Sequence, residues 1–268
     1  MGPLPRRGPE VRTLDLPLPP ARMALLRRGR PLKRWRYVAL YRPDFMLCVG
    51  DARVAGIPQR WWALALPDST LIEGSSGISL PAGRAVVESP QLELDLALKE
   101  GPGVEVVSPH GRSWIWTRKQ AGVRARGHVR CALGSWDVDG DDAFIDESAG
   151  YHARHTTWNW SAGIGRTLDG RPAAWNLVVG VHDAPTASER TLWLDGEPSE
   201  LPPLEFAADL SRVGDLAFTP WAAREDHSRR LFFRSDYLQP FGSFTGSLPG
   251  GVELEHGYGV MEWHDVRW

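Results

Sequence analysis

The sequence is poor in cysteine and has no long apolar run. Its two cysteines, Cys48 and Cys131, form no CxxC pair, which argues against a zinc site or a disulfide framework and favours two reduced thiols. No apolar run approaches the ~20 residues of a membrane-spanning helix. The segment Met1–Glu10 lacks the apolar stretch of a secretory signal. We therefore expect a cytoplasmic protein without a transmembrane segment.

An excess of charge of one sign is also missing. The chain of 268 residues has 31 basic and 33 acidic residues and a formal net charge of -2, so no overall field draws it to nucleic acid or to an anionic membrane. The G-x-S-x-G, P-loop and dinucleotide motifs are absent, which removes the usual support for a serine hydrolase, a nucleotide hydrolase or an NAD-dependent enzyme. His182-Asp183 and His264-Asp265 have no third ligand at a recognisable spacing, so we expect neither a metal nor a cofactor.

What the sequence has instead is a series of short β-prone runs. Leu92, Leu94, Leu96 and Leu98 alternate with polar or small residues, a period of two that places one face of a strand in a core. The Asp-Gly pairs at 139–140, 169–170 and 195–196 are typical of hairpin turns. No long helix is predicted, which excludes α/β architectures. The pattern predicts an all-β protein of antiparallel strands, as two barrels or one large sandwich.

The segment from Asp137 to Ser161 has the most residues that could carry chemistry. On a strand, Trp158 and Trp160 share one face while Asn159 and Ser161 share the other. Such a strand makes an aromatic wall for a ligand, or it fills a core. A second Trp-Asn pair, Trp175-Asn176, follows one hairpin later and suggests a shared polar site. The other candidates in or near this segment are Tyr151 and His155.

Six carboxylates lie between Asp137 and Glu147. Their spacing does not fit a calcium loop, because position six is not glycine and position twelve is not glutamate. We interpret most of them as a solvated acidic hairpin. Asp146 and Glu147 are different because they adjoin the tryptophan segment, where apolar surroundings raise the pKa of a carboxyl group and let it donate a proton.

The chain ends on a further β-prone segment, in which Glu262 and His264 share one strand face. A terminal strand that completes a sheet explains this segment. Alternatively, Glu262 and His264 contribute to a ligand site.

Several motifs resemble the bacterial family DUF2804. They occur in the family's order from about Pro31 to Trp268, and the tail departs from the expected Glu-Glu-His ending. The motifs are Lys33–Tyr37, Lys119-Gln120 with Gly127, Tyr151–Trp160, Phe218–Pro220, Gln239–Gly246 and Glu262–His264. More distantly, the chain is similar to carotenoid hydratases and tocopherol-cyclase-like proteins.

The resemblance implies two consecutive lipocalin-like (calycin-type) antiparallel β-barrels with little helix. Residues 1–30, with six prolines before position 21, are expected to form an extended arm. Residues 31–145 would form the first barrel and residues 146–268 the second.

Our functional hypothesis is a protein that binds an apolar small molecule, lipid-like or isoprenoid-like, in a barrel cavity lined by tryptophan. The residues expected to line it are Tyr151, Trp158, Asn159, Trp160, Trp175, Asn176, Glu262 and His264. A first alternative is a lyase or isomerase that protonates a carbon-carbon double bond, with Asp146 or Glu147 as the acid and His155 beside it. A second is a carbohydrate-binding or interaction module that stacks exposed tryptophans on its partner. The sequence does not indicate an oligomeric state.

Overall fold

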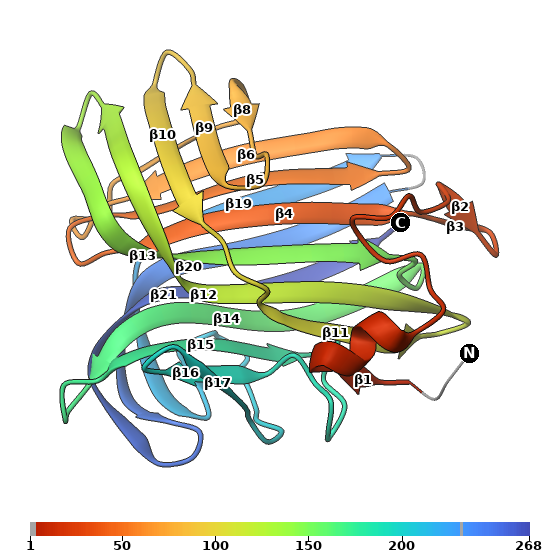
Figure 1. Cartoon of the computed structure of the whole chain (residues 1–268). Coiled ribbons are helices and arrows are strands. Elements are labelled where there is room, and N and C mark those ends of the chain that lie inside the picture. The colour runs from red at the N-terminus through yellow and green to blue at the C-terminus, as the bar shows by residue number, and fades with distance from the viewer. Residues whose placement is uncertain (1–3, 231–232) are drawn as a thin grey trace.

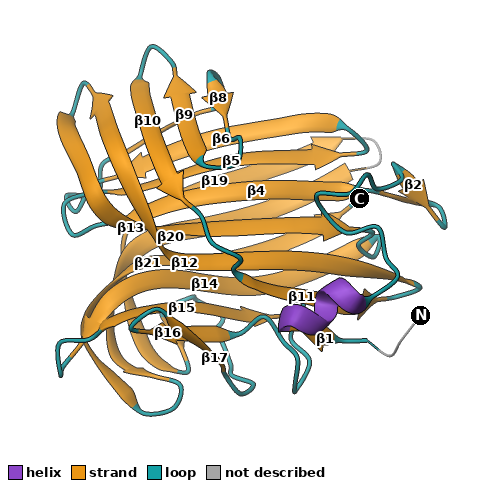
Figure 2. Ribbon diagram, in the orientation of Figure 1, coloured by secondary structure: helices purple, strands orange, loops and turns teal. Residues whose placement is uncertain are grey.

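The computed structural model describes residues 4–230 and 233–268 and is built almost entirely of antiparallel strands (Figures 1 and 2). It contains an 11-stranded sheet, an 8-stranded sheet and a 2-stranded sheet. The expected all-β antiparallel fold is confirmed. Across the described residues there is no helix with the length and hydropathy that a membrane crossing requires.

The first sheet is formed by the N-terminal half of the chain, in the order β7-β6-β5-β4-β13-β12-β10-β9-β8, with β11 paired to β12 and β1 to β11. Its strands are β1 (Arg6–Arg7), β4 (Lys33–Tyr41), β5 (Met46–Val54), β6 (Ile57–Ala65), β7 (Leu71–Gly74), β8 (Ile78–Ser79), β9 (Arg84–Glu88), β10 (Leu92–Lys99), β11 (Val104–His110), β12 (Ser113–Cys131) and β13 (Gly134–Gly150).

The second sheet has the order β17-β16-β15-β14-β21-β20-β19-β18. Its strands are β14 (His155–Thr167), β15 (Pro172–Val179), β16 (Thr191–Leu194), β17 (Glu197–Glu200), β18 (Arg212–Val213), β19 (Asp215–Arg230), β20 (Phe233–Leu248) and β21 (Val252–Arg267). In both sheets the first long strand pairs with the last, β4 with β13 and β14 with β21. The two halves of the chain therefore share one strand arrangement.

The chain passes from the first sheet to the second between Gly150, the end of β13, and His155, the start of β14. The boundary expected at residues 145 and 146 therefore falls inside β13. In the segment expected to be an extended arm, residues 8–13 form a 3-10 helix, η1 (Gly8–Thr13), and β2 (Leu26–Arg27) pairs with β3 (Arg30–Pro31).

Strand periodicity predicted the burial pattern well in β10. Leu92, Leu94, Leu96 and Leu98 are all buried in the core of the first sheet. The Asp-Gly pairs at 169–170 and 195–196 lie in turns as predicted. The pair Asp139-Gly140 does not, because Gly140 (φ 85°) lies within β13 at a break in register with β12. A glycine with a positive φ occurs in β-bulges as well as in turns.

The interior of each sheet is filled by side chains. The core of the first sheet includes Phe45 and Trp62, and the core of the second includes Trp175 and Phe244. A third core, with Phe144, Trp160 and Phe241 among its members, joins residues of both sheets. These packed side chains occupy the interior of each sheet, where a barrel cavity was expected.

Candidate functional site

A cavity of about 770 Å³ lies where the two sheets face each other. Strands β4, β5, β6, β12 and β13 line it from one side, and β14, β15, β19, β20 and β21 line it from the other. Its size falls within the ~300–1,000 Å³ typical of small-molecule sites. Aromatic rings from both sheets form much of the wall: Trp35, Tyr37, Trp61, Trp158, Trp160 and Tyr237.

The two sheets bring equivalent groups to this cavity. In the first, Trp35 Nε1 donates to Asp146 Oδ2 at 3.2 Å; in the second, Trp158 Nε1 donates to Glu262 Oε1 at 2.7 Å. Each bond runs diagonally between the first and last long strands of its sheet, because Asp146 is opposite Tyr37 in register and Glu262 is opposite Trp160. The Trp35 and Trp158 rings are nearly parallel, with centroids 6.5 Å apart. The shared strand arrangement therefore places two tryptophan-carboxylate pairs face to face.

Glu262 is a buried carboxyl group held by three donors. Besides Trp158, Tyr237 Oη donates at 2.9 Å and Gln239 Nε2 donates at 2.9 Å, both to Oε2. Burial raises the pKa of Glu262 to about 6, and the hydrogen bonds from Trp158 and Tyr237 partly oppose that shift. A group with this pKa exchanges a proton readily near neutral pH. Glu262 therefore has the properties that we expected of Asp146 or Glu147.

Asp146 has a different environment. Lys119 Nζ is 2.6 Å from Asp146 Oδ1 and 3.4 Å from Glu189 Oε1. The two carboxylates outweigh the burial of Lys119 and raise its pKa, so this amine stays cationic. Burial raises the pKa of Glu189. The two oxygens of Asp146 contact Trp35 Nε1 and Lys119 Nζ, and this position suits Asp146 to orient both side chains.

A second polar region of the cavity contains Lys33, His152 and His182. Lys33 Nζ donates to the carbonyl oxygen of His152 at 3.3 Å. Burial lowers the pKa of both imidazoles well below the usual value, so both rings are neutral. His152 Nδ1 and His182 Nε2 are buried and have no hydrogen-bond partner in the described part of the chain. Unpartnered buried nitrogens in a cavity wall are suited to bind polar atoms of a ligand.

His264 also lines the cavity, as expected for a residue on the same face as Glu262. Its ring lies 4.4 Å from the Trp158 ring, and Nε2 is 2.8 Å from Ser235 Oγ. Burial lowers the pKa of His264 to about 3. The ring is therefore neutral and packs beside Trp158.

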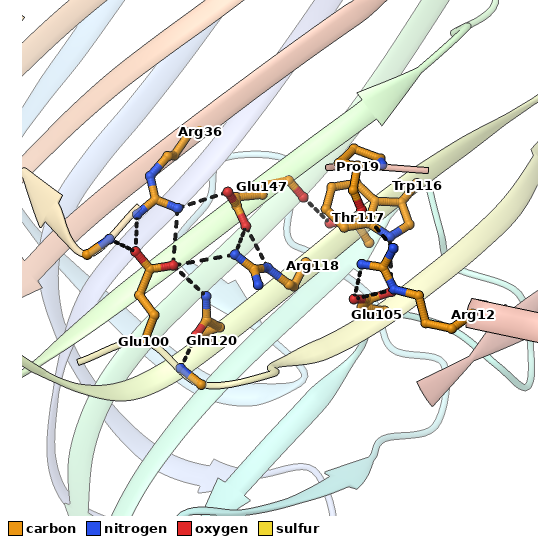
Figure 3. Close-up of polar contacts among 12 residues, drawn as sticks. Arg12, Pro19, Arg36, Glu100, Glu105, Trp116, Thr117, Arg118, Gln120 and Glu147 are labelled. Atoms are coloured by element: carbon orange, nitrogen blue, oxygen red, sulfur yellow. Dashed lines mark hydrogen bonds and ion pairs between the residues drawn. The ribbon is translucent and has the colours of Figure 1, made fainter. Parts of the chain in front are cut away.

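Glu147 points away from the cavity, because successive residues of a strand face opposite sides. Figure 3 shows Glu147 between Arg36 and Arg118, with Glu100 completing the ionic network. Arg36 Nη1 is 2.8 Å from Glu147 Oε1, and Arg118 Nε is 2.6 Å from Oε2. Asp146 and Glu147 lie within the long strand β13, and this placement excludes Glu147 from the cavity.

Four other predicted residues do not line the cavity. His155 is exposed and lies 2.9 Å from Asp265. Tyr151 packs against Trp114 near the N-terminal segment and donates to the carbonyl oxygen of Ala24. Asn159 faces the opposite side of β14, and Trp175 fills the core of the second sheet. These positions follow from the strand faces and from the core within each sheet.

Asn176 supports the wall from behind. Its Oδ1 accepts from Trp160 Nε1 at 2.8 Å, and its Nδ2 donates to the carbonyl oxygen of Glu189 at 2.8 Å. The segment Trp158–Trp160 thus meets the pair Trp175-Asn176 through Trp160 and Asn176, on the neighbouring strands β14 and β15. The expectation that these strands are neighbours is confirmed.

The sequence patterns do not assign Lys33, Trp35, Lys119, Glu189, Tyr237 or Gln239 to a site, although Lys33, Trp35, Lys119 and Gln239 lie in the motifs of the family resemblance. One signal is present: Trp35-Arg36-Tyr37 has the same aromatic-polar-aromatic pattern as Trp158-Asn159-Trp160. Lys119 lies opposite Asp146 on the neighbouring strand β12, whereas only the packing of the two sheets brings Glu189 to Lys119. Among the described residues, no group of three His, Cys, Asp or Glu side chains is arranged to hold a metal ion.

A family model described as a domain of unknown function, DUF2804, matches residues 72–268. A search of curated proteins finds no match. Among solved structures, an AttH candidate from Nitrosomonas europaea is similar, with a TM-score of 0.47 and 14% identity, over 93% of this chain and 98% of that one. Kievitone hydratase from Nectria haematococca has a TM-score of 0.44 and 9% identity over 88% of each chain. CghA with Sch210972 has a TM-score of 0.43 and 11% identity over 88% of each chain.

Proposed function

This chain belongs to the DUF2804 family, and on that premise we propose that it binds a small, largely apolar organic molecule in the cavity between its two sheets. The family description assigns no function, so the proposal rests on the side chains of the cavity. The observation that carries it is the facing pair of indole rings, Trp35 and Trp158, each oriented by its own carboxylate. Oriented aromatic walls bind flat or unsaturated apolar groups.

The distribution of tryptophan favours this function over binding on an outer surface. All 13 tryptophans are buried or half-buried, and five line the cavity: Trp35, Trp61, Trp158, Trp160 and Trp268. A module that stacks sugars on a flat sheet needs exposed rings. The carbohydrate alternative therefore has no support from the surface of this chain.

Ligand retention tests the proposal directly. Native mass spectrometry of protein purified from its own host should show a bound mass that organic extraction removes. Ala52→Trp, which enlarges a residue of the cavity wall, should remove the bound mass. Ala97→Trp, on the exposed face of β10, is the matched control and should retain it. Retention of the ligand by Ala52→Trp would place the binding site elsewhere.

A second function is favoured by Glu262. We propose that this carboxyl group exchanges a proton with a carbon of a bound, unsaturated substrate, as in an isomerase, a hydratase or a cyclase. Glu262 lies in the cavity wall and its pKa of about 6 matches proton transfer near neutral pH. The reaction class is the one expected for a lyase or isomerase, with Glu262 as the acid in place of Asp146 or Glu147.

Deuterium incorporation tests the second function even when the product is unidentified. The extracted ligand is incubated with protein in heavy water, and its mass is measured. Wild-type protein should introduce deuterium, and Glu262→Gln should bind the ligand but introduce none. Equal incorporation by both proteins would exclude Glu262 as the exchanging group and leave binding as the function.

A further inference from the structure

We propose that the molecule bound in this cavity is an amphipathic carboxylic acid whose carboxylate binds to Lys33. The inference rests on the proposed function and specifies its ligand class. It assigns Lys33, His152 and His182 to the polar end of the ligand and the tryptophan wall to its apolar body. The reasons are the missing counter-charge of Lys33, the two unpartnered imidazole nitrogens of residues that line the same cavity, and the charge of the cavity wall.

Lys33 is a buried amine without a carboxylate. Its side chain lines the cavity and the residue is 1% exposed. Nζ contacts the carbonyl oxygen of His152 and lies 4.5 Å from the centre of the Trp268 ring. Among the residues that the structure describes, no carboxylate forms an ion pair with Lys33, whereas Lys119 has two. An ammonium group buried without an anion is unfavourable, and a ligand carboxylate would remove that cost.

Among the described residues the groups that face Lys33 include no carboxylate at ion-pair distance, although the charge of Asp183 acts on the neighbouring His110. Arg30 from β3 and His110 from β11 face it in addition to His152. Burial, together with the nearby charge of Arg30, lowers the pKa of Lys33 to about 7. The pKa of His110 is lowered by burial as well. Between pH 7 and pH 9, Lys33 is therefore the member of this cluster whose charge changes most, and a bound anion would favour its protonated form.

The imidazoles of His152 and His182, which line the same cavity, supply further donors. His182 Nδ1 lies 2.9 Å from Ser108 Oγ. When that hydroxyl donates to Nδ1, Nε2 of the neutral ring carries the proton and can donate to a ligand oxygen. His152 Nδ1 is the other buried nitrogen without a partner. A carboxylate has about four acceptor sites, enough for the amine and both imidazoles.

The cavity wall is positive although the protein is not. Six basic side chains line the cavity: Lys33, Arg34, Arg53, Arg60, Lys119 and Arg224. The acidic side chains are four: Asp146, Glu189, Asp226 and Glu262. Arg53 and Arg60 both lie within ion-pair distance of Asp51, so with that carboxylate included the formal surplus is one positive charge, whereas the whole chain carries -2. A surplus of positive charge favours anionic ligands.

The experiment compares cis-parinaric acid, a polyene fatty acid whose fluorescence rises in apolar surroundings, with its methyl ester. Both are titrated into wild-type protein, Lys33→Met and Lys99→Met at about pH 7. Lys99 is the matched control because it is exposed and does not line the cavity. We expect wild type and Lys99→Met to bind the acid at least ~10-fold more tightly than the ester. Tenfold in affinity is what one favourable charge pair worth about one pKa unit would contribute. Lys33→Met should remove this preference and leave the ester affinity unchanged.

A pH series on wild-type protein gives a test that does not depend on the folding of a variant. Raising the pH from about 7 to about 9 should weaken binding of the acid at least ~10-fold, because the Lys33 amine loses its proton, and should not change binding of the ester. Ester bound as tightly as acid by wild type would overturn the carboxylate assignment and leave the proposed function standing. Equal loss of acid and ester in Lys33→Met would also overturn it. Binding of neither probe to wild type would count against the proposed function itself.

Discussion

Replacing Glu262 with glutamine should change how the stability of this protein depends on pH. Glu262 is 8% exposed, and its carboxylate accepts from Trp158, Tyr237 and Gln239. Glutamine has nearly the same size but does not titrate. The variant therefore removes one buried titration and leaves the shape of the cavity wall nearly intact.

The size and sign of the effect follow from the pKa of Glu262. Burial raises that pKa from 4.5 to about 6, so between these values the folded protein binds more protons at this site than the unfolded chain does. The free energy of unfolding therefore falls as the pH rises through this range. Below this range the carboxyl group is protonated in both states and causes no loss of stability. A shift of about 1.5 units at 1.36 kcal/mol each corresponds to about 2 kcal/mol. Glu262→Gln should lack this loss.

Urea denaturation at a series of pH values measures this pH-dependent loss of stability. The free energy of unfolding of Glu262→Gln minus that of wild type should increase by about 2 kcal/mol between about pH 4 and about pH 7. Titrations of other groups cancel in this difference. Glu253→Gln, at an exposed position of the same strand, is the control and should follow the wild-type profile. Parallel profiles for wild type and Glu262→Gln would refute the reasoning, because they would mean that this carboxyl group titrates alike in both states.

Three further variants or treatments have defined outcomes. Lys119→Met leaves two carboxylates without their cation and should destabilise the protein by about 3–5 kcal/mol in urea denaturation; a loss under about 1 kcal/mol would argue against a tight ion pair. Gly163→Ala places a Cβ 2.1 Å from the Trp175 ring and should cost about 1–3 kcal/mol by overpacking, which thermal unfolding would detect. Burial raises the pKa of Cys48 to about 12, so iodoacetamide should label Cys48 only after unfolding. Mass spectrometry of native and denatured samples would show this, and labelling of Cys48 in native protein would contradict its burial.

The repeated tryptophan-carboxylate pair gives the cavity an unequal chemistry on its two sides. Asp146 is neutralised by Lys119, whereas Glu262 is surrounded by uncharged donors. The same strand positions in the two sheets therefore hold an ion-paired carboxylate and a carboxyl group with a pKa of about 6. This difference makes Glu262 the better candidate for proton transfer and Asp146 a positioning residue.

Local patterns predicted the parts of the fold that depend on near neighbours in sequence. The alternation of leucines at 92–98 predicted a half-buried strand, and the positions of Trp158 and Trp160 predicted that both rings share one face. The same logic failed at Asp139-Gly140, where an Asp-Gly pair forms a bulge within a longer strand. The choice between Asp146 and Glu147 could not be made until that strand was known to continue through them.

By itself, the sequence determined an antiparallel all-β chain and which side chains share a strand face, because a period of two follows from backbone geometry alone. Only the tertiary structure decided which strand faces pack into the interior of their own sheet and which faces lie against the other sheet. That choice filled both sheet interiors, opened the cavity between them, and brought Glu189 to Lys119 and the Trp35 ring to the Trp158 ring, from positions far away in the chain. Long-range packing of this kind depends on how two surfaces fit together, and no local pattern of residues encodes it.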